Sequence, residues 1–419
     1  MTRCLTALVA TTALCASPAF ADLREDVVAN YAEIGAATYG DAAVTAHALQ
    51  TAVDAFLAAP SEAGLEAARD AWKAARAPYM QSEVFRFGNP VVDAWEGQVN
   101  AWPLDEGLID YVDADSAAVN EENDYALLNV VANPQITIAG TAVDASQITP
   151  ALIADVLQEA DGIEANVASG YHAVEFLLWG QDLNGTGPGA GARAYTDYLQ
   201  GDSCTNGNCD RRAAYLKAVT DLLVTDLDEM AAAWQPGGAA RAAITDDTNT
   251  GIAAILTGLG SLSYGELAGE RMKLGLMLHD PEEEQDCFSD NTYNSHYYDG
   301  IGMQNVLTGR YNRVDGSVVQ GASLQSLIAE EDPAVAEELT AKIATSVAAL
   351  TALKDKAEGG MAYDQMLATG NAEGGALIQA SVDALIDQTR SIERAVKVLG
   401  ADASIEGSDS LDAPTTVFQ

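Results

Sequence analysis

The sequence predicts an all-α protein built from two helical bundles. Alanine is abundant, apolar residues recur at three- and four-residue steps, and the alternating pattern of a β-strand is rare. A chain of 419 residues is too long for one ordinary hydrophobic core, so two domains are expected. Long helices of similar length joined by loops are typical of up-and-down bundles.

The first 21 residues form a predicted signal peptide. Arg3 provides a short basic start, Leu5–Cys15 is an apolar core of about 11 residues, and Ala19–Ala21 is a small-x-small cleavage site. Cleavage after Ala21 would release a periplasmic protein of the cell envelope. No later stretch approaches about 18 uninterrupted apolar residues, so the sequence predicts no direct membrane span.

Acidic residues dominate the charge of the chain. Asp and Glu number 62 against 21 Lys and Arg, which gives a formal net charge of −41 at pH 7. Nucleic acid and anionic lipid are therefore excluded as partners, because both would be repelled. Cationic ligands, including metal ions, are permitted. The alternative is that the acidity only solvates the surface.

The predicted N-terminal bundle spans residues 22–235. One or two helices cover Leu23–Leu57 and end before Pro60, and Ser61 caps the next helix. Gly88-Asn89-Pro90 breaks that helix.

The middle of this bundle is less regular. Residues 97–150 are a mixture of loop and short helix, with a small turn or hairpin expected within Thr137–Ile148. Helix is predicted over Ile153–Trp179, with interruptions near two glycines, and again over Asp210–Trp234, which has a clear apolar face.

Gln235-Pro236-Gly237-Gly238 is the predicted boundary between the two halves. The C-terminal bundle, residues 236–419, is predicted as a helix over Thr248–Leu278, a loop-rich stretch over Asp280–Asn312, and long helices over Leu324–Lys356 and Gly374–Leu399. Tyr79–Gly88 and Tyr264–Gly275 each place Glu and Arg on a helix that leads into a loop, which favours a duplication.

The cysteines predict one disulfide. Cys204 and Cys209 bracket the turn-rich sequence Thr-Asn-Gly-Asn, and the periplasm favours oxidation. Two cysteines without a neighbouring His cannot complete a four-ligand zinc site. Cys287 is then left over, and we interpret it as a small buried hydrophobe rather than a nucleophile.

The motif Gly-x-His-x-x-Glu carries the strongest chemical signal. His172 and Glu175 lie three residues apart, so on a helix they share one face and could chelate an ion or hydrogen-bond to each other. Their apolar surroundings make an unpaired Glu costly, so Glu175 should have a partner. The structural alternative is a buried His–Glu hydrogen bond that only fixes the helix.

Further motifs accompany this one in a fixed order along the chain. They are Trp72, Glu83–Gly88, Trp102–Asp105, Gly170–Glu175, Arg211–Leu216, Glu266–Met272 and Cys287–Thr292. The series resembles the imelysin-like family, in particular its iron-regulated periplasmic branch, over nearly the whole mature chain. The resemblance implies two helical bundles related by duplication, with a site in the cleft between them. It also implies an association with iron uptake, and some members have been described as metallopeptidases.

The resemblance assigns residues to the site. His172 and Glu175 match the Gly-x-His-x-x-Glu signature and are the implied ligands of iron or another divalent metal. Early Glu-x-x-Arg, later Gly-Glu-Arg-Met and Cys-Phe-Ser-Asp-Asn elements are matched as well. The implied ligand-binding cleft therefore comprises Glu83, Arg86, Glu270, Arg271, Ser289, Asp290 and Asn291.

One departure from the family pattern concerns a histidine. Where many relatives have His after Asn-Thr, this chain has Tyr293, and His296 follows three residues later. If the family His is a ligand or a base, its role is lost here or has moved to His296.

Several of these residues have structural alternatives. Arg86 and Arg271 could simply pair with Glu83 and Glu270 across a bundle interface. Asp290 could cap a helix or close an Asx turn. The tryptophans at positions 72, 179 and 234 are most simply core anchors.

Three functions are compatible with the sequence. The first is a non-enzymatic periplasmic protein that binds iron or a small iron-bearing ligand and works with an envelope iron-transport partner. The second is a metallopeptidase, but the usual zinc peptidase helix carries His-Glu-x-x-His, whereas this helix turn supplies one imidazole. An oxygen-rich ligand set also favours iron over zinc. The third is a structural envelope protein.

Overall fold

The computed structural model describes residues 19–113 and 123–417 and confirms a mostly helical protein, with 65% helix and 4% strand. So little strand leaves no sheet to form a core, and apolar surface is buried between helices. The predicted signal peptide, residues 1–21, lies outside the described residues except for its last three positions, where the first helix begins.

Two long helices, α1 and α6, frame the N-terminal part of the chain. Its elements are α1 (Ala19–Ala58), α2 (Glu62–Met80), η1 (Glu83–Phe85), α3 (Pro90–Glu96), η2 (Glu106–Leu108), β1 (Gln135–Ile138), β2 (Thr141–Asp144), α4 (Pro150–Leu152), η4 (Ile153–Leu157), η5 (Ala160–Gly162), α5 (Gly170–Trp179), η6 (Tyr195–Tyr198), η7 (Gly201–Ser203) and α6 (Cys209–Ala233).

Helix α2 begins where the sequence predicts. The Oγ of Ser61 accepts a hydrogen bond of 3.2 Å from the backbone N–H of Gly64, which satisfies one of the free donors at the helix start. Trp72, Ala75 and Tyr79 are buried along one side of α2, which packs against α1. The buried ring of Trp72 also donates from Nε1 to the carbonyl of Tyr171 at 2.9 Å. Helix α2 thereby supports α5, the helix that carries the His–Glu motif.

Strands β1 and β2 form an antiparallel hairpin that overlaps the stretch where a turn or hairpin is expected. The loops around the hairpin are held by buried amides: Asn123 donates to Asn166 Oδ1 at 2.7 Å, and Asn166 donates to the carbonyl of Ala160 at 2.7 Å. These hydrogen bonds satisfy backbone and side-chain groups that have no regular ladder to join.

Helix α5 is shorter than predicted. The helix predicted from Ile153 is wrong for most of the stretch before Gly170, which holds only the π-helical turn η4 and the short η5. Glu159 and Asp161 adopt left-handed φ angles of 50° and 61°, which end the helical path. Gly170 then has a φ of +76°, and a Cβ there would lie 2.4 Å from the carbonyl oxygen of Val99. Only glycine allows the chain to enter α5 past Val99.

The predicted disulfide is confirmed. Cys204 and Cys209 are bonded to each other, and Cys287 is free and buried. The disulfide loop is anchored by the buried carboxylate of Asp197, which accepts a hydrogen bond of 2.6 Å from Thr205 Oγ1.

The C-terminal part is dominated by three long helices. Its elements are α7 (Ala239–Thr245), α8 (Thr248–Ser261), η8 (Leu262–Lys273), α9 (Leu274–Leu278), η9 (Pro281–Glu283), α10 (Thr292–Thr308), β3 (Arg310–Asn312), β4 (Val318–Gln320), α11 (Leu324–Glu331), α12 (Pro333–Glu358), α13 (Tyr363–Leu367), α14 (Ala372–Leu399) and α15 (Asp409–Asp412).

Two sequence predictions for this part need correction. The stretch Asp280–Asn312 is not loop-rich throughout, because α10 occupies most of its second half. Its glycines and polar residues weaken the helical signal, but burial of its inner face against α2 and α12 outweighs propensity. Leu324–Lys356 is two helices rather than one, because Pro333 starts α12 and the Asp332 carboxylate caps it.

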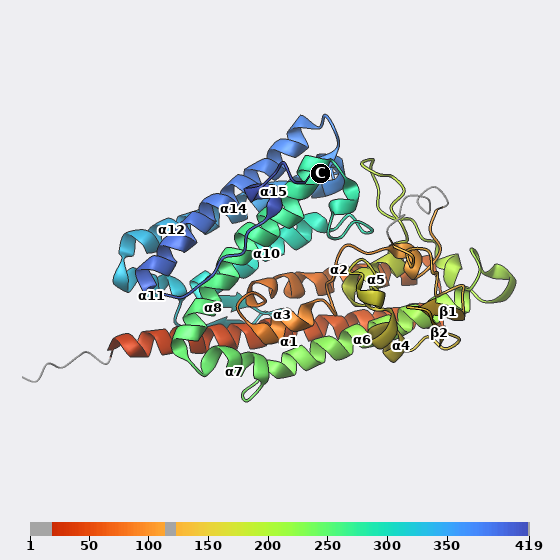
Figure 1. Ribbon diagram of the computed structural model, residues 1–419, viewed down its shortest axis with the longest axis horizontal. Helices are drawn as coiled ribbons and strands as arrows, with labels where there is room; N and C mark the ends of the chain where they lie inside the picture. The colour runs from red at the N-terminus through yellow and green to blue at the C-terminus, as the bar shows by residue number, and fades with distance from the viewer. Residues whose placement is uncertain (1–18, 114–122, 418–419) are drawn as a thin grey trace, which may run out of the picture.

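Figure 1 shows α1 and α6 side by side, α12 and α14 paired above them, and α10 between the two groups. Helix α10 contacts α12 on one side and, on the other, α2, which packs against α1. It therefore joins the two groups. The duplication of the two halves stays a prediction. None of the described helices is both long and apolar enough to cross a membrane.

Replacing Gly170 with Ala should destabilise the protein strongly. The matched control is Gly162→Ala, because Gly162 has a φ of +74° but nothing within 4 Å of the position that a methyl group would occupy there. We expect Gly162→Ala to cost about 1 kcal/mol from the left-handed backbone alone. Gly170→Ala should cost at least about 3 kcal/mol, because the Val99 backbone must also move. Urea unfolding followed by circular dichroism measures both, and equal losses would contradict the close approach at Val99.

Candidate metal centre

Helix α5 presents His172 and Glu175 on one face, as their spacing predicts. His172 Nδ1 lies 3.1 Å from Glu175 Oε2, and neither side chain is exposed to solvent. The other nitrogen of His172, Nε2, is buried and has no hydrogen-bond partner within the described chain. A buried imidazole nitrogen without a partner is costly, but the nitrogen that faces Glu175, and so could share an ion with it, is Nδ1.

Two of the three residues of the segment Ser289-Asp290-Asn291 donate hydrogen bonds to carboxylates of the site. Ser289 donates twice to Glu175 Oε1, from its backbone N–H at 2.9 Å and from Oγ at 2.6 Å. Asn291 donates from Nδ2 to Asp286 Oδ2 at 3.0 Å. Asp290 makes no such contact: its Oδ1 lacks a hydrogen-bond partner among the described residues, and burial together with the nearby carboxylate of Asp364 raises its pKa to about 7.

Asp286 completes the cluster, and the sequence analysis missed it. Its Oδ1 lies 3.9 Å from His172 Nδ1 and accepts a hydrogen bond of 2.8 Å from Arg76. Ser295 donates to the other carboxylate oxygen. Asp286 directly precedes the Cys-Phe-Ser-Asp-Asn segment, so its position next to that motif was the one signal that could have identified it.

His172, Glu175 and Asp286 form one compact group. Each offers a ligand atom, these atoms lie within 4.8 Å of one another, and all three residues are buried. No other trio of His, Cys, Asp or Glu in the described residues is this close. Two ligands each about 2.1 Å from an ion lie at most about 4.2 Å apart, so a small inward movement would let the three share one ion.

The electrostatics favour a neutral imidazole. Burial, with the nearby guanidinium of Arg76, lowers the pKa of His172 to about 3, so its nitrogens keep their lone pairs free of an added proton at neutral pH. Burial and the charge of Asp286 raise the pKa of Glu175 well above its usual value. Burial alone would raise the pKa of Asp286 too, but Arg76 and His172 lower it further than that. One nitrogen and two carboxylate ligands suit Fe(II) and similar divalent ions.

The two Glu–Arg motifs are joined in the structure by one of the ion pairs that the structural alternative names. Arg271 does not pair with Glu270 but reaches across to Glu83 at 2.6 Å, and it also contacts Glu266 at 2.7 Å and Asp299 at 3.2 Å. The burial of Arg271 needs this many carboxylates, because a buried guanidinium is costly unless several acceptors surround it.

Arg86, Glu270 and Arg271 line one cavity of about 460 Å³, which we call the glutamate pocket. Its wall comprises Arg86, Glu96, Gly97, Asn100, Ala101, Trp102, Pro103, Glu159, Glu164, Glu266, Glu270, Arg271, Leu274, Glu283 and Gln285. The wall draws on residues from both sides of the predicted boundary. Burial and the nearby carboxylate of Glu83 raise the pKa of Glu96 to about 7. Glu83 itself is buried behind Arg271, and Ser289, Asp290 and Asn291 are not part of the wall.

His296 does not replace the missing family histidine as a ligand in this cluster. It is fully buried in α10, its ring centroid lies 5.1 Å from that of Tyr363, and it is not part of the compact group. Tyr293 is half-buried at the start of α10, where the ammonium of Lys354 on α12 is 5.4 Å from its ring centroid.

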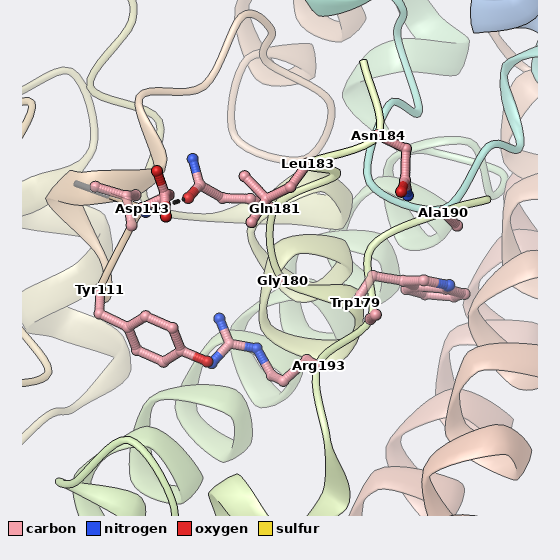
Figure 2. A pocket seen from close by; sticks show the side chains of 11 residues that line it. Tyr111, Asp113, Trp179, Gly180, Gln181, Leu183, Asn184, Ala190 and Arg193 are labelled. Carbon is pink, nitrogen blue, oxygen red and sulfur yellow. Dashed lines mark hydrogen bonds between the residues drawn. The ribbon is translucent and has the colours of Figure 1, made fainter. Parts of the chain in front are cut away.

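A separate cavity of about 380 Å³ lies beyond the C-terminal end of α5 (Figure 2). Figure 2 shows Arg193 beside Tyr111 and the backbone N–H of Asp113 donating to Gln181. The guanidinium of Arg193 is already bonded to Asp110 at 2.8 Å, so its charge is neutralised within the protein. None of the three candidate metal ligands lines this cavity.

A family model described as Imelysin, Peptidase_M75, matches residues 35–392. The chain belongs to the imelysin family. This imelysin-family protein is 26% identical over 332 residues to iron-regulated protein A of Synechococcus elongatus, covering 78% of this chain and 74% of that one.

Two solved structures share the fold. One, assigned as an iron-regulated protein A precursor from Parabacteroides distasonis, aligns with a TM-score of 0.64 at 19% identity and covers 92% of this chain and 97% of its own. The other, an imelysin-like protein from Psychrobacter arcticum, aligns with a TM-score of 0.58 at 16% identity and covers 92% and 98%.

Buried His296 should make the protein sensitive to acid. Burial is the main cause that lowers its pKa to about 3, whereas an unfolded His titrates near 6.5. As the pH falls below 6.5, His296 takes up a proton in the unfolded chain but stays neutral in the folded chain. The free energy of unfolding therefore falls. Between pH 7 and pH 5 the titration of His296 should lower the free energy of unfolding of the parent by about 2 kcal/mol.

His296→Gln should therefore lose about 2 kcal/mol less than the parent over this pH interval, as measured by urea unfolding at both pH values. The control is His47→Gln, at a side chain that is half exposed in the folded protein. If His296→Gln and the parent lose the same free energy of unfolding, His296 titrates normally in the folded state.

Proposed function

We propose that this protein binds a divalent metal ion, iron foremost, through His172, Glu175 and Asp286, and serves iron acquisition in the cell envelope. The observation that carries the proposal is the buried trio itself, with ligand atoms within 4.8 Å of one another. The nitrogen Nδ1 of His172 supports it, because this atom lies 3.1 Å from Glu175 Oε2 and 3.9 Å from Asp286 Oδ1 and so faces both carboxylates.

The relatives support the choice of iron. The curated relative in Synechococcus elongatus is called iron-regulated protein A, and the Parabacteroides distasonis structure is assigned to a protein of the same name. The predicted signal peptide and the net charge of −41 fit an exported protein that attracts cations. A bare ion fits the compact trio better than an iron-bearing small molecule, because all three candidate ligands are buried.

A metallopeptidase is the second candidate, and the family description names a peptidase. Catalytic zinc sites keep a position open for water or substrate. Here all three candidate ligands are buried, so a polypeptide carbonyl would reach them only after the surrounding loops move. We therefore rank binding above peptide hydrolysis.

The structural alternative rests on Arg76. Arg76, Asn291 and Ser295 already donate hydrogen bonds to Asp286. Ser289 donates twice to Glu175, so the cluster could serve only to hold the helices together. A metal ion would have to share Asp286 with Arg76. Binding measurements separate this alternative from the proposed function.

The parent protein, purified without chelators, should take up one Fe²⁺ or Co²⁺ per chain under anaerobic conditions. The near-isosteric variants Glu175→Gln and Asp286→Asn, and His172→Ala, should each weaken binding at least about 100-fold, because each removes a ligand from a three-ligand set. Isothermal titration and metal analysis give the stoichiometry and affinity.

The control is Asp290→Asn, which changes a carboxylate of the same segment that does not join the trio. It should bind like the parent to within about twofold, because it removes no ligand. If Glu175→Gln and Asp286→Asn bind like Asp290→Asn, the site lies elsewhere. If the parent binds no ion and the variants only lose stability, the cluster is structural.

The peptidase candidate has its own test. Cleavage of unfolded protein substrates that disappears with chelator and with Glu175→Gln would establish it. We expect no such cleavage.

A further inference from the structure

A guanidinium already occupies one side of the candidate metal centre. Arg76 Nη2 donates a hydrogen bond of 2.8 Å to Asp286 Oδ1, and that same oxygen lies 3.9 Å from Nδ1 of His172. The other oxygen of Asp286 accepts hydrogen bonds from Asn291 and Ser295. Oδ1 is therefore the oxygen that faces the rest of the trio, and an ion bound to it would be a near neighbour of the positive charge of Arg76.

Arg76 is held in this position by contacts that do not involve Asp286. Its Nη1 donates to Asn100 Oδ1 at 2.6 Å. Its guanidinium lies over the rings of Tyr171 and Trp72, at 5.1 and 5.7 Å from the ring centroids. Cations are attracted to the faces of aromatic rings. These contacts keep the charge of Arg76 beside the centre even when Asp286 binds an ion.

Burial prevents water from screening this charge. The side chains of Arg76 and Asp286 are at most 1% exposed, and His172 and Glu175 are not exposed at all. Metal ligands act as ionised carboxylates and a neutral imidazole, so the trio and Arg76 together carry one net negative charge. A divalent ion would leave one net positive charge there and a trivalent ion two. Unbalanced charge inside a protein is costly.

We infer that Arg76 makes the candidate centre select divalent over trivalent ions, and thus Fe²⁺ over Fe³⁺. This inference rests on the proposed function, because it concerns the ion that the trio binds. Coulomb repulsion is proportional to the product of the two charges, so in free energy Arg76 opposes a trivalent ion about one and a half times as strongly as a divalent ion. The carboxylates of Glu175 and Asp286 by themselves attract the trivalent ion more strongly, and Arg76 offsets that preference.

Arg76→Gln removes the charge and keeps a side-chain amide that can donate a hydrogen bond. We expect it to bind Co²⁺ at least about tenfold more tightly than the parent does, and Ga³⁺, a trivalent ion without redox chemistry, at least about thirtyfold more tightly, because the logarithms of the two gains should stand at about two to three. Competition with citrate, which keeps Ga³⁺ in solution, gives both affinities. Equal gains for the two ions, or weaker binding of both, would overturn the inference.

The matched control is Arg193→Gln. Arg193 Nη1 lies 2.8 Å from Asp110 Oδ2 and both side chains are at most 2% exposed, so this variant breaks an ion pair of the same length and similar burial outside the trio. It should change the affinity for either ion less than about twofold. If it matches the gains of Arg76→Gln, those gains come from a general loosening of the protein, and the inference on Arg76 is overturned.

Asn100→Asp tests the same charge with the buried Arg76 in place, so the test does not depend on the folding of Arg76→Gln. The new carboxylate would replace the amide oxygen that lies 2.6 Å from Nη1 and would neutralise the guanidinium from the side away from Asp286. Both ions should bind more tightly than they do to the parent, with the larger gain for Ga³⁺. A parent that binds Co²⁺ beside an Asn100→Asp variant without a larger gain for Ga³⁺ would overturn the inference on Arg76 alone. A parent and variants that take up neither ion would contradict the proposed function itself.

Discussion

The buried ion pair between Arg76 and Asp286 holds together the parts of the chain that form the candidate centre. Their side-chain atoms lie 2.8 Å apart, and both side chains are at most 1% exposed. Leaving either charge buried alone would cost about 3–5 kcal/mol, so α2 must stay docked on the segment that leads into α10. That docking places Asp286 Oδ1 3.9 Å from Nδ1 of His172, which belongs to a third segment, helix α5.

The same ion pair limits how tightly the centre could hold a metal. Arg76 and a neutral His172 leave the cluster with one net negative charge when both carboxylates are ionised. A divalent ion reverses that excess rather than cancelling it, and it must share Asp286 with the guanidinium. Such a balance fits an ion that enters and leaves more readily than one held permanently in a closed structural site.

Local sequence signals predicted some of the site and missed the rest for identifiable reasons. The three-residue spacing of His172 and Glu175 is a property of one helix turn, so it could be predicted without the fold. Arg76 is one charged residue on an amphipathic helix, and only packing shows that it points inward. The sequence leaves open which carboxylates surround Arg271, because spacing along one segment cannot reveal a partner 188 residues away.

The sequence by itself determined the helical class, the disulfide between Cys204 and Cys209, and the helix face that carries the His–Glu pair. These depend on periodicity, on short loops and on spacing within one turn, all of which are local. Only the tertiary structure decided that Asp286 joins that pair and that the glutamate pocket lies beside it. Both depend on which distant segments pack together. A buried charge needs a partner, and that partner can come from any part of the chain that the fold brings near.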